Sequence, residues 1–401
     1  MYNLVERGLI MPRLIGTVAM GLRAPIIKKG DDLVTIVSDM VSEVGESEVR
    51  LRDRDVVAIT ESLLARSQGN YASIYDIAKD FKDKFAGDEV AILFPILSRN
   101  RFSTLLKAFA LTGKKLHICL SYPADEVGNL LMDEMDLFNS DVNAYSDVLD
   151  MEEFKEVAGS YKHLFTDMDY PKFYKSLAEN SEIHFLNNPV DALKFTDNVL
   201  VASIHNRDLV KKQLLDAGAK KVLKLDELLI KSVNGSGYNP DYGLLGSNLS
   251  TEDSVKLFPR DSQDFVEDLQ KRLVEKTGKK IEVMVYGDGA FKDPVGHIWE
   301  LADPVVSPGF TSGLIGTPNE LKLKYVADND LSDLSGDEAI EEFKKLVRDK
   351  DKNTDDNKRL GTTPRQITDL LGSLSDLVSG SGDKGTPVVL IQGYFDNYSN
   401  D

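Results

Sequence analysis

The chain has 401 residues and a formal net charge of −18, because 66 acidic side chains outnumber 48 basic ones. This acidity argues against nucleic acid as a partner, since a phosphate backbone needs a basic surface, although a divalent cation can still bring a nucleotide to an acidic protein. The length exceeds what one ordinary hydrophobic core supports, so we expect two or more lobes.

Composition also bears on the cellular compartment. No apolar run approaches the roughly 20 residues that span a bilayer, and the N-terminal stretch is interrupted by charges that do not fit a signal peptide. The single cysteine, Cys119, lies in the apolar run LHICL, where we expect a core residue, and one cysteine excludes a disulfide within the chain. We therefore expect a cytoplasmic protein without a membrane partner.

The first informative block is Pro25–Leu33, which reads PIIKKGDDL and precedes a helical pattern. Its turn, Gly30, Asp31 and Asp32, has two interpretations that the residues leave open. It contacts a nucleotide, or it caps the following helix, because aspartate is favoured at a helix N-terminus.

The second block is Asp53–Gln68, which reads DRDVVAITESLLARSQ. The run DVVAIT predicts a strand, and the residues after it predict a helix. Glu61 and Ser62 follow the strand directly, so we expect them to line a cleft at its end.

Residues 71–232 alternate short strand and helix signals, as a small α/β lobe would. Strand signals recur along the whole chain, in the runs LIGTVAM, DVVAIT, EVAILFP, KLHICLS, NVLVASI, KKVLKL, IEVMVY and PVVLIQG. Helical patterns separate several of these runs. The predicted fold class is therefore mixed α/β (α+β), with more than one lobe.

The segment Gly237–Phe258 predicts a loop rich in glycine and asparagine that ends in a strand-like VKLF. A helix fits Ser262–Thr277, with Ser262 and Asp264 as plausible caps and Gly278 as a stop.

The next segment, Ile281–Pro294, reads IEVMVYGDGAFKDP. Its alternation predicts a half-buried strand, which runs into a glycine-rich loop carrying Asp288 and, five positions later, Asp293. Acidic groups at the end of a strand are a common way to hold a hard cation against phosphate oxygens. The alternative is a tight turn in which Asp288 only caps backbone amides.

The five histidines are scattered and lack the spacing of a zinc site. We interpret four of them as ordinary core or surface residues, namely His117, His163, His184 and His205. His297 lies nine residues after Asp288 and is a candidate to face the same cleft.

Near the C-terminus, Thr363–Tyr394 predicts a helix, a glycine break and a buried strand, PVVLIQG. With this block the chain resembles the coenzyme F-420-0:L-glutamate ligase family, the GTP-dependent gamma-glutamyl ligases. That family shows P-x-I-x-x-GDDL, a GDV(L/V)-V-x-(Q/E)-K-like strand and helix, a GxxxSN loop, a strand ending in D-x-(F/A)-G and a final PV-x-L-(I/V)-(R/Q)-G-Y. The matching segments stand in family order and cover about half of the chain: Pro25–Leu33, Asp55–Ser67, Gly243–Asn248, Val283–Phe291 and Thr363–Tyr394.

The resemblance implies a multi-lobed fold like that of these ligases. Residues 1–70 and 233–401 would form the ligase core, and residues 71–232 an inserted α/β lobe. It also implies GTP as co-substrate, Mg²⁺ or Mn²⁺ as cofactor with K⁺ as an additional candidate ion, a glutamate-bearing small-molecule substrate, and a homodimer.

Particular roles follow from the same resemblance. Asp288 matches a metal-binding aspartate of the family, with Asp241 or Asp293 as the expected second ligand, and we expect Asp288 and Lys292 to be catalytic. The expected nucleotide-binding residues are Gly30, Asp31, Asp32, Glu61, Ser62, Ser247 and Asn248. One departure matters: where the family carries an aspartate two residues before the Ser-Asn pair, this chain has Leu245, and Asp241 is the candidate to replace it.

The expected reaction follows from chemistry. Forming an amide from a carboxylate in water is uphill, so a ligase first transfers the γ-phosphoryl of a nucleotide to the carboxylate, and the amine of glutamate then attacks the acyl phosphate. We therefore expect a GTP-dependent gamma-glutamyl ligase. The alternatives are a catalytically altered nucleotide-binding or regulatory protein on the same scaffold, or a ligase acting on a folate-like acceptor.

Overall fold

The computed structural model describes residues 15–164, 166–287, 306–350, 365–380 and 382–397. Within them the chain forms two five-stranded sheets and one three-stranded sheet, with helices packed around them. The predicted mixed α/β class is confirmed. All eight strand-like runs of the sequence contain strands.

The core sheet joins segments from both ends of the chain. Its order is β1-β13-β2-β11-β12, built from Val18–Leu22, Val388–Gln392, Val56–Thr60, Glu282–Gly287 and Val306–Phe310. β2 and β11 are parallel, with Val56 opposite Glu282 and Thr60 opposite Tyr286. The other neighbours are antiparallel.

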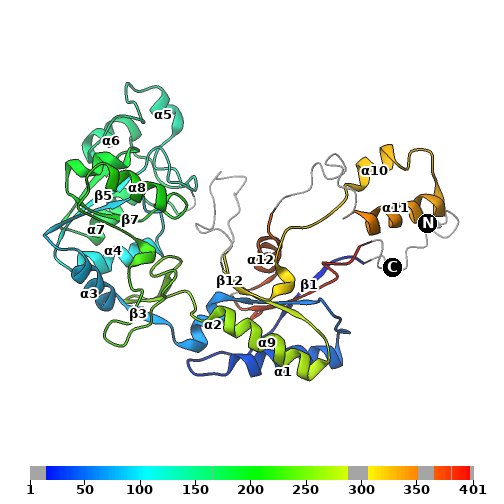
Figure 1. Ribbon diagram of the computed structural model, residues 1–401. Helices are drawn as coiled ribbons and strands as arrows, with labels where there is room; N and C mark the ends of the chain where they lie inside the picture. The colour runs from blue at the N-terminus through cyan, green and yellow to red at the C-terminus, as the bar shows by residue number, and fades with distance from the viewer. Residues whose placement is uncertain (1–14, 165, 288–305, 351–364, 381, 398–401) are drawn as a thin grey trace.

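Helices cover both faces of this sheet (Figure 1). Helices α1 (Leu33–Ser47) and α9 (Ser262–Thr277) lie side by side on one face, and α12 (Ile367–Val378) lies on the other. Along β2, Val57 and Ile59 pack with α1 and α9, while Val56 and Ala58 pack with α12. The sheet is thus the middle layer of three.

This layering corrects one expectation. β11 is buried along its whole length rather than half-buried, because its alternate residues meet a helix on either side. The polar member, Glu282, is only 2% exposed and accepts hydrogen bonds from Thr311 and, at 3.1 Å, from Gln270.

The helix α9 begins and ends at the predicted residues. Gly278 ends it with a left-handed φ of 66°, as expected for a glycine stop. The predicted caps are wrong: Asp261, not Ser262 or Asp264, occupies the N-cap position, and its side chain makes no capping hydrogen bond.

The second lobe is built on an all-parallel sheet with the order β6-β5-β4-β7-β8. These strands are Ser181–Phe185, Lys115–Leu120, Glu89–Leu93, Asn198–Val201 and Lys221–Lys224. One face packs against α3 (Ile74–Lys84), α4 (Phe102–Ala110), α6 (Met151–Ala158) and α7 (Tyr170–Leu177). The other face packs against α8 (Arg207–Asp216) and the short helix η2 (Pro189–Lys194). Cys119 is buried there, as predicted.

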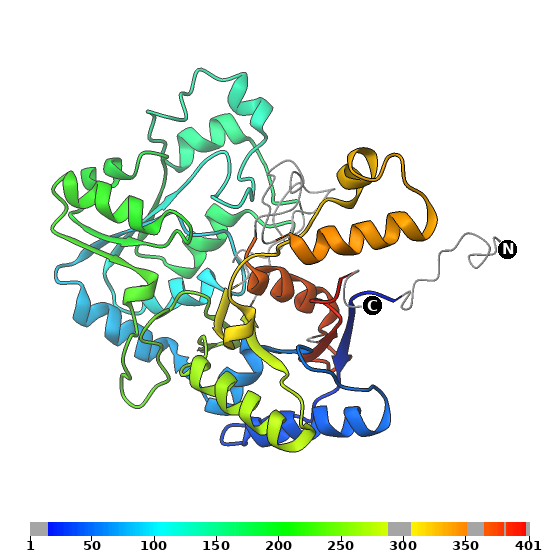
Figure 2. The same cartoon turned by 45° about the vertical axis from the view of Figure 1, so that its right-hand side comes forward.

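A small antiparallel sheet lies between the two lobes, with the order β3-β10-β9. Its strands are Tyr71–Ser73, Ser254–Lys256 and Asn248–Thr251, and α2 (Glu61–Gln68) leads into it from the core sheet. The remaining elements are α5 (Glu134–Phe138), η3 (Leu225–Glu227), η4 (Ser312–Leu314), α10 (Leu323–Asn329) and α11 (Gly336–Asp349). α10 and α11 have a small apolar cluster of their own and are drawn in orange in Figure 2.

None of the helices in the described ranges combines the length and the apolar character needed to cross a membrane.

The packing of β12 on α9 leads to a stability prediction. A Cβ added at Gly309 would lie 2.4 Å from the carbonyl oxygen of Ser262. Gly309→Ala should therefore lower the free energy of unfolding by about 1–3 kcal/mol, the usual cost of overpacking, as measured by chemical denaturation. Gly16→Ala is the control, because a Cβ there meets no heavy atom within 4 Å. Equal stability of the two variants would contradict this packing.

Candidate functional site

A cavity of about 530 Å³ opens at the carboxyl ends of the parallel strands β2 and β11. In open α/β sheets this is where ligands bind, because successive strands deliver polar loop residues to one edge. The wall combines the loop 24–27, the junction of β2 and α2, the small sheet, the end of β11 and the segment that follows α12. Its polar lining residues are Thr60, Glu61, Ser62, Arg66, Asn248, Lys256, Tyr286, Asp376 and Ser379.

An ion pair lies at the centre of this wall. The Nζ of Lys256 lies 3.6 Å from Oε1 of Glu61 and also donates to the hydroxyl of Ser62. The side chains of Lys256 and Glu61 are only 15% and 12% exposed. Charges this poorly hydrated interact more strongly than surface charges, so each holds the other in place.

The ring of Phe258 brings two glycine-containing loops together. A Cβ added at Gly246 would lie 2.2 Å from one edge of this ring, and a Cβ added at Gly287 would lie 2.8 Å from its tip. The Gly287 Cβ would also lie 3.3 Å from Cγ of Glu61. Only glycine allows these approaches. The Ser-Asn loop, the end of β11 and the start of α2 therefore converge beside the cavity.

A second acidic side chain lines the cavity. Asp376 of α12 is half-buried there, beside Tyr286. Burial, together with the nearby carboxylates of Asp376 and Glu61, raises the pKa of Tyr286 well above its usual value. Tyr286 is therefore a neutral phenol, and its hydroxyl lies 3.4 Å from the carbonyl oxygen of Ser375, to which it donates.

The Gly30–Asp32 turn lies outside the cavity lining, although Pro25, Ile26 and Ile27 belong to it. Asp32 caps α1 by accepting from Thr35, which lowers the pKa of this carboxyl. Asp31 accepts from the backbone N–H of Lys28 at 2.6 Å. The structure thus shows the helix-cap alternative for Asp32.

The other predicted nucleotide-binding residues lie at two different places. Glu61, Ser62 and Asn248 line the cavity together. Ser247 instead borders a small apolar cavity of about 40 Å³ with Leu245, and its buried hydroxyl has no hydrogen-bond partner among the described residues.

Of the candidate metal ligands, only Asp241 lies within the described residues. Asp241 is exposed and does not line the large cavity. Leu245, at the position of the family aspartate, is buried in the apolar cluster of the second lobe. Asp288, Lys292, Asp293 and His297 fall outside the described residues, and Gly287 is the last described residue before them.

Sequence reasoning missed several lining residues, among them Lys256 and Asp376. The signal for Lys256 was present, since it alternates with buried Val255 and Leu257 in the strand-like VKLF. The sequence around Asp376 showed no such alternation. Asp376 lies on a helix, and the apolar pattern of that helix predicts only its buried face.

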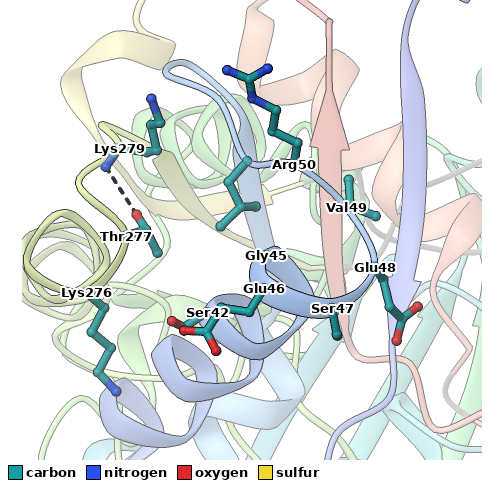
Figure 3. Close-up of a pocket in the computed structure, with 11 residues that line it drawn as sticks. Ser42, Gly45, Glu46, Ser47, Glu48, Val49, Arg50, Lys276, Thr277 and Lys279 are labelled. Carbon is teal, nitrogen blue, oxygen red and sulfur yellow. Dashed lines mark hydrogen bonds between the residues drawn. The ribbon is translucent and has the colours of Figure 1, made fainter.

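A second cavity of about 520 Å³ lies at the opposite ends of the same strands (Figure 3). It is bordered by the last turns of α1 and α9, where the hydroxyl of Thr277 accepts from the backbone N–H of Lys279 at 3.2 Å. Lys276 in its wall is paired with Asp39. Arg50 and Lys279 precede β2 and β11, so this cavity faces the amino ends of the strands, where ligands bind less often.

Comparison with known proteins identifies the family of the chain. No curated protein matches the sequence. A family described as F420-0:Gamma-glutamyl ligase matches residues 21–393, which includes the small sheet, the second lobe and all of the core sheet except the start of β1. The match spans nearly the whole chain, and the chain therefore belongs to the F420-0:gamma-glutamyl ligase family.

Proposed function

We propose that this ligase couples GTP hydrolysis to the joining of L-glutamate to a carboxylate acceptor, and that the cavity at the carboxyl ends of β2 and β11 binds the nucleotide phosphates. The observation that carries this proposal is the meeting of Glu61, Asn248 and Lys256 in one cavity. These residues come from separate parts of the chain, and two of them belong to blocks shared with the family.

The charges of the cavity explain why a divalent ion is needed. Glu61 and Asp376 would repel a bare triphosphate, and Lys256 is already paired with Glu61. Carboxylate oxygens are the donors that Mg²⁺ and Mn²⁺ prefer, so the acidic wall fits such an ion. Among the described residues no third acidic side chain lines the cavity. We assign the further ligands to Asp288 and Asp293, and not to the exposed Asp241.

The chain's own residues then act on the phosphates. The first turn of α2 opens into the cavity, and the amino end of a helix favours anions. Lys256 supplies a positive charge, while the amide of Asn248 and the hydroxyl of Ser62 supply hydrogen bonds. A divalent ion held by the carboxylates would supply the charge that neutralises the phosphate oxygens.

The reaction has two steps, and in each step one bond forms and one bond breaks. An oxygen of the acceptor carboxylate takes the γ-phosphoryl group, and GDP leaves. The amine of glutamate then attacks the carbonyl carbon of the acyl phosphate, the bond to the phosphate oxygen breaks, and the amine loses a proton as the amide forms.

One structural observation favours a second candidate function. Because Leu245 is buried in an apolar cluster, the position that carries an aspartate in the family offers no ligand here. A nucleotide-binding or regulatory protein that no longer turns over is the alternative. It would bind nucleotide with metal but release no phosphate with glutamate and any acceptor, folate-like acceptors included.

Thermal melting tests the binding step. GTP with Mg²⁺ or Mn²⁺ at about 100 times its dissociation constant should add roughly 2.7 kcal/mol. For lobes of roughly 150–250 residues the melting temperature should rise by about 5–10 °C. GTP alone should give a smaller shift, because the carboxylates then repel the phosphates. No shift with GTP or ATP and either metal would contradict both candidate functions.

Two aspartate variants separate the candidate metal ligands. Asp288→Ala should abolish metal-dependent phosphate release while the melting temperature without ligands stays unchanged. Asp241→Ala should retain activity, because Asp241 is exposed and outside the cavity. If Asp241→Ala instead abolished phosphate release and Asp288→Ala retained it, the metal ligand would be Asp241 and not Asp288.

Lys256 is the third test. Lys256→Met should lower phosphate release by roughly 10²-fold, in the range found when one transition-state donor is removed. It also leaves Glu61 without this cation, so stability should fall. Lys256→Met combined with Glu61→Gln serves as the control for folding: it should recover stability and remain inactive. A fully active Lys256→Met variant would exclude Lys256 from the phosphate site.

A further inference from the structure

The second lobe contains a cluster of two histidines and a glutamate that the ligase reaction does not use. His117 lies on β5, and Glu182 and His184 lie on the neighbouring strand β6. His117 stands opposite Glu182 in the parallel ladder, and Glu182 and His184 are two residues apart on one face of the sheet. The ligand atoms of all three therefore point to a common position.

The distances between these atoms match a metal site. Nδ1 of His117 lies 3.2 Å from Nε2 of His184, and Oε2 of Glu182 lies 3.5 Å from the first nitrogen and 3.7 Å from the second. Tetrahedral ligands at about 2.0–2.1 Å from a zinc ion stand about 3.3–3.4 Å from one another. The triangle therefore needs only small shifts to become one face of such a tetrahedron.

A hydrogen bond between the two histidines accounts for only one side of this triangle. Glu182 is at or beyond the limit of a hydrogen bond to both rings. Its other oxygen, Oε1, holds the ammonium group of Lys115 at 2.8 Å, which directs Oε2 towards the rings.

The surroundings also orient the rings. Nε2 of His117 lies 3.3 Å from a carboxylate oxygen of Glu89, to which it can donate, so that Nδ1 keeps its lone pair for a metal. A carboxylate behind a ligating histidine is a common feature of zinc sites. The ring of Phe195 stacks on His184, with centroids 3.8 Å apart and planes 14° apart.

Protons compete weakly for His184 and Glu182 at neutral pH. Burial, with the neighbouring His117, lowers the pKa of His184 to about 4. The hydrogen bond from Lys115, together with the charge of Lys115, lowers the pKa of Glu182. His184 is thus neutral and Glu182 is ionised, which are the forms that bind a metal.

We propose that His117, His184 and Glu182 bind one divalent transition-metal ion of the zinc class in the second lobe, separate from the Mg²⁺ or Mn²⁺ of the ligase site. Two imidazole nitrogens and one carboxylate select zinc over the hard ions that prefer oxygen donors. Glu182 is half-exposed, so water can complete the coordination. The proposal does not depend on the ligase activity.

Cobalt absorption is the test, because tetrahedral Co²⁺ absorbs visible light strongly and octahedral Co²⁺ does so only weakly. The full chain is stripped with a chelator and titrated with Co²⁺ in excess Mg²⁺, which occupies oxygen-donor sites. We expect a tetrahedral band that saturates at one equivalent and disappears when Zn²⁺ is added. A wild-type chain that is folded but shows no such band has a hydrogen-bonded histidine pair only, and the proposal is then overturned.

Variants locate the ion. His184→Gln and Glu182→Gln should lose the band, and Glu182 is exposed enough that its variant should fold normally. Glu89→Gln should keep the band with about 10–100-fold weaker affinity, the usual effect of removing a partner of a ligating histidine. The control is His205→Gln, whose histidine is exposed and outside the cluster. A band that survives in both His184→Gln and Glu182→Gln would overturn the assignment.

Discussion

The candidate ligase site depends on the parallel pairing of β2 with β11. The two strands come from distant parts of the chain, yet Thr60 stands opposite Tyr286, so both strands end at the same edge of the sheet. Because helices cover both faces, a slip of one residue would exchange the side chains that meet α1 and α9 with those that meet α12. Burial on two sides therefore locks the register. The register in turn brings Glu61 beside Gly287.

Charge then determines what the cavity can accept. Glu61 and Asp376 make the lining of the cavity acidic, while Lys256 is paired with Glu61. Under the proposed function, such a lining would suit a phosphate ligand only with a metal ion beside it. The strong overall acidity of the chain fits this proposal, since the metal ion would bring the positive charge that a nucleotide needs.

The two lobes use the same structural principle with different chemistry. Parallel neighbours β2 and β11 assemble oxygen donors at the end of a sheet, and parallel neighbours β5 and β6 assemble His117, Glu182 and His184 on the face of another. Oxygen donors favour hard ions, and imidazole favours zinc and its neighbours. The two proposed metal sites therefore differ in donor type, and each would favour its own kind of ion.

Local patterns in the sequence were sufficient to predict secondary-structure elements and to identify the family. Residues 262–277 showed the helix α9 and Gly278 its end, because side-chain periodicity and a left-handed stop act over a few residues. The eight strand-like runs followed from the same short-range preferences, and the order of the five blocks identified the family that the comparison confirms. The aspartate turn at residues 30–32 left two interpretations open, since capping and ligand binding use the same residue type.

Only the tertiary structure decided which of these residues meet. It buried both faces of β11, paired Lys256 with Glu61, added Asp376 to the cavity and left Asp241 on the surface. It also brought together two histidines whose spacing in the sequence shows no sign of a shared site. The reason is the same in each case: contacts between distant segments are set by strand pairing and by burial of apolar faces, and neither is encoded in the spacing of a few neighbouring residues.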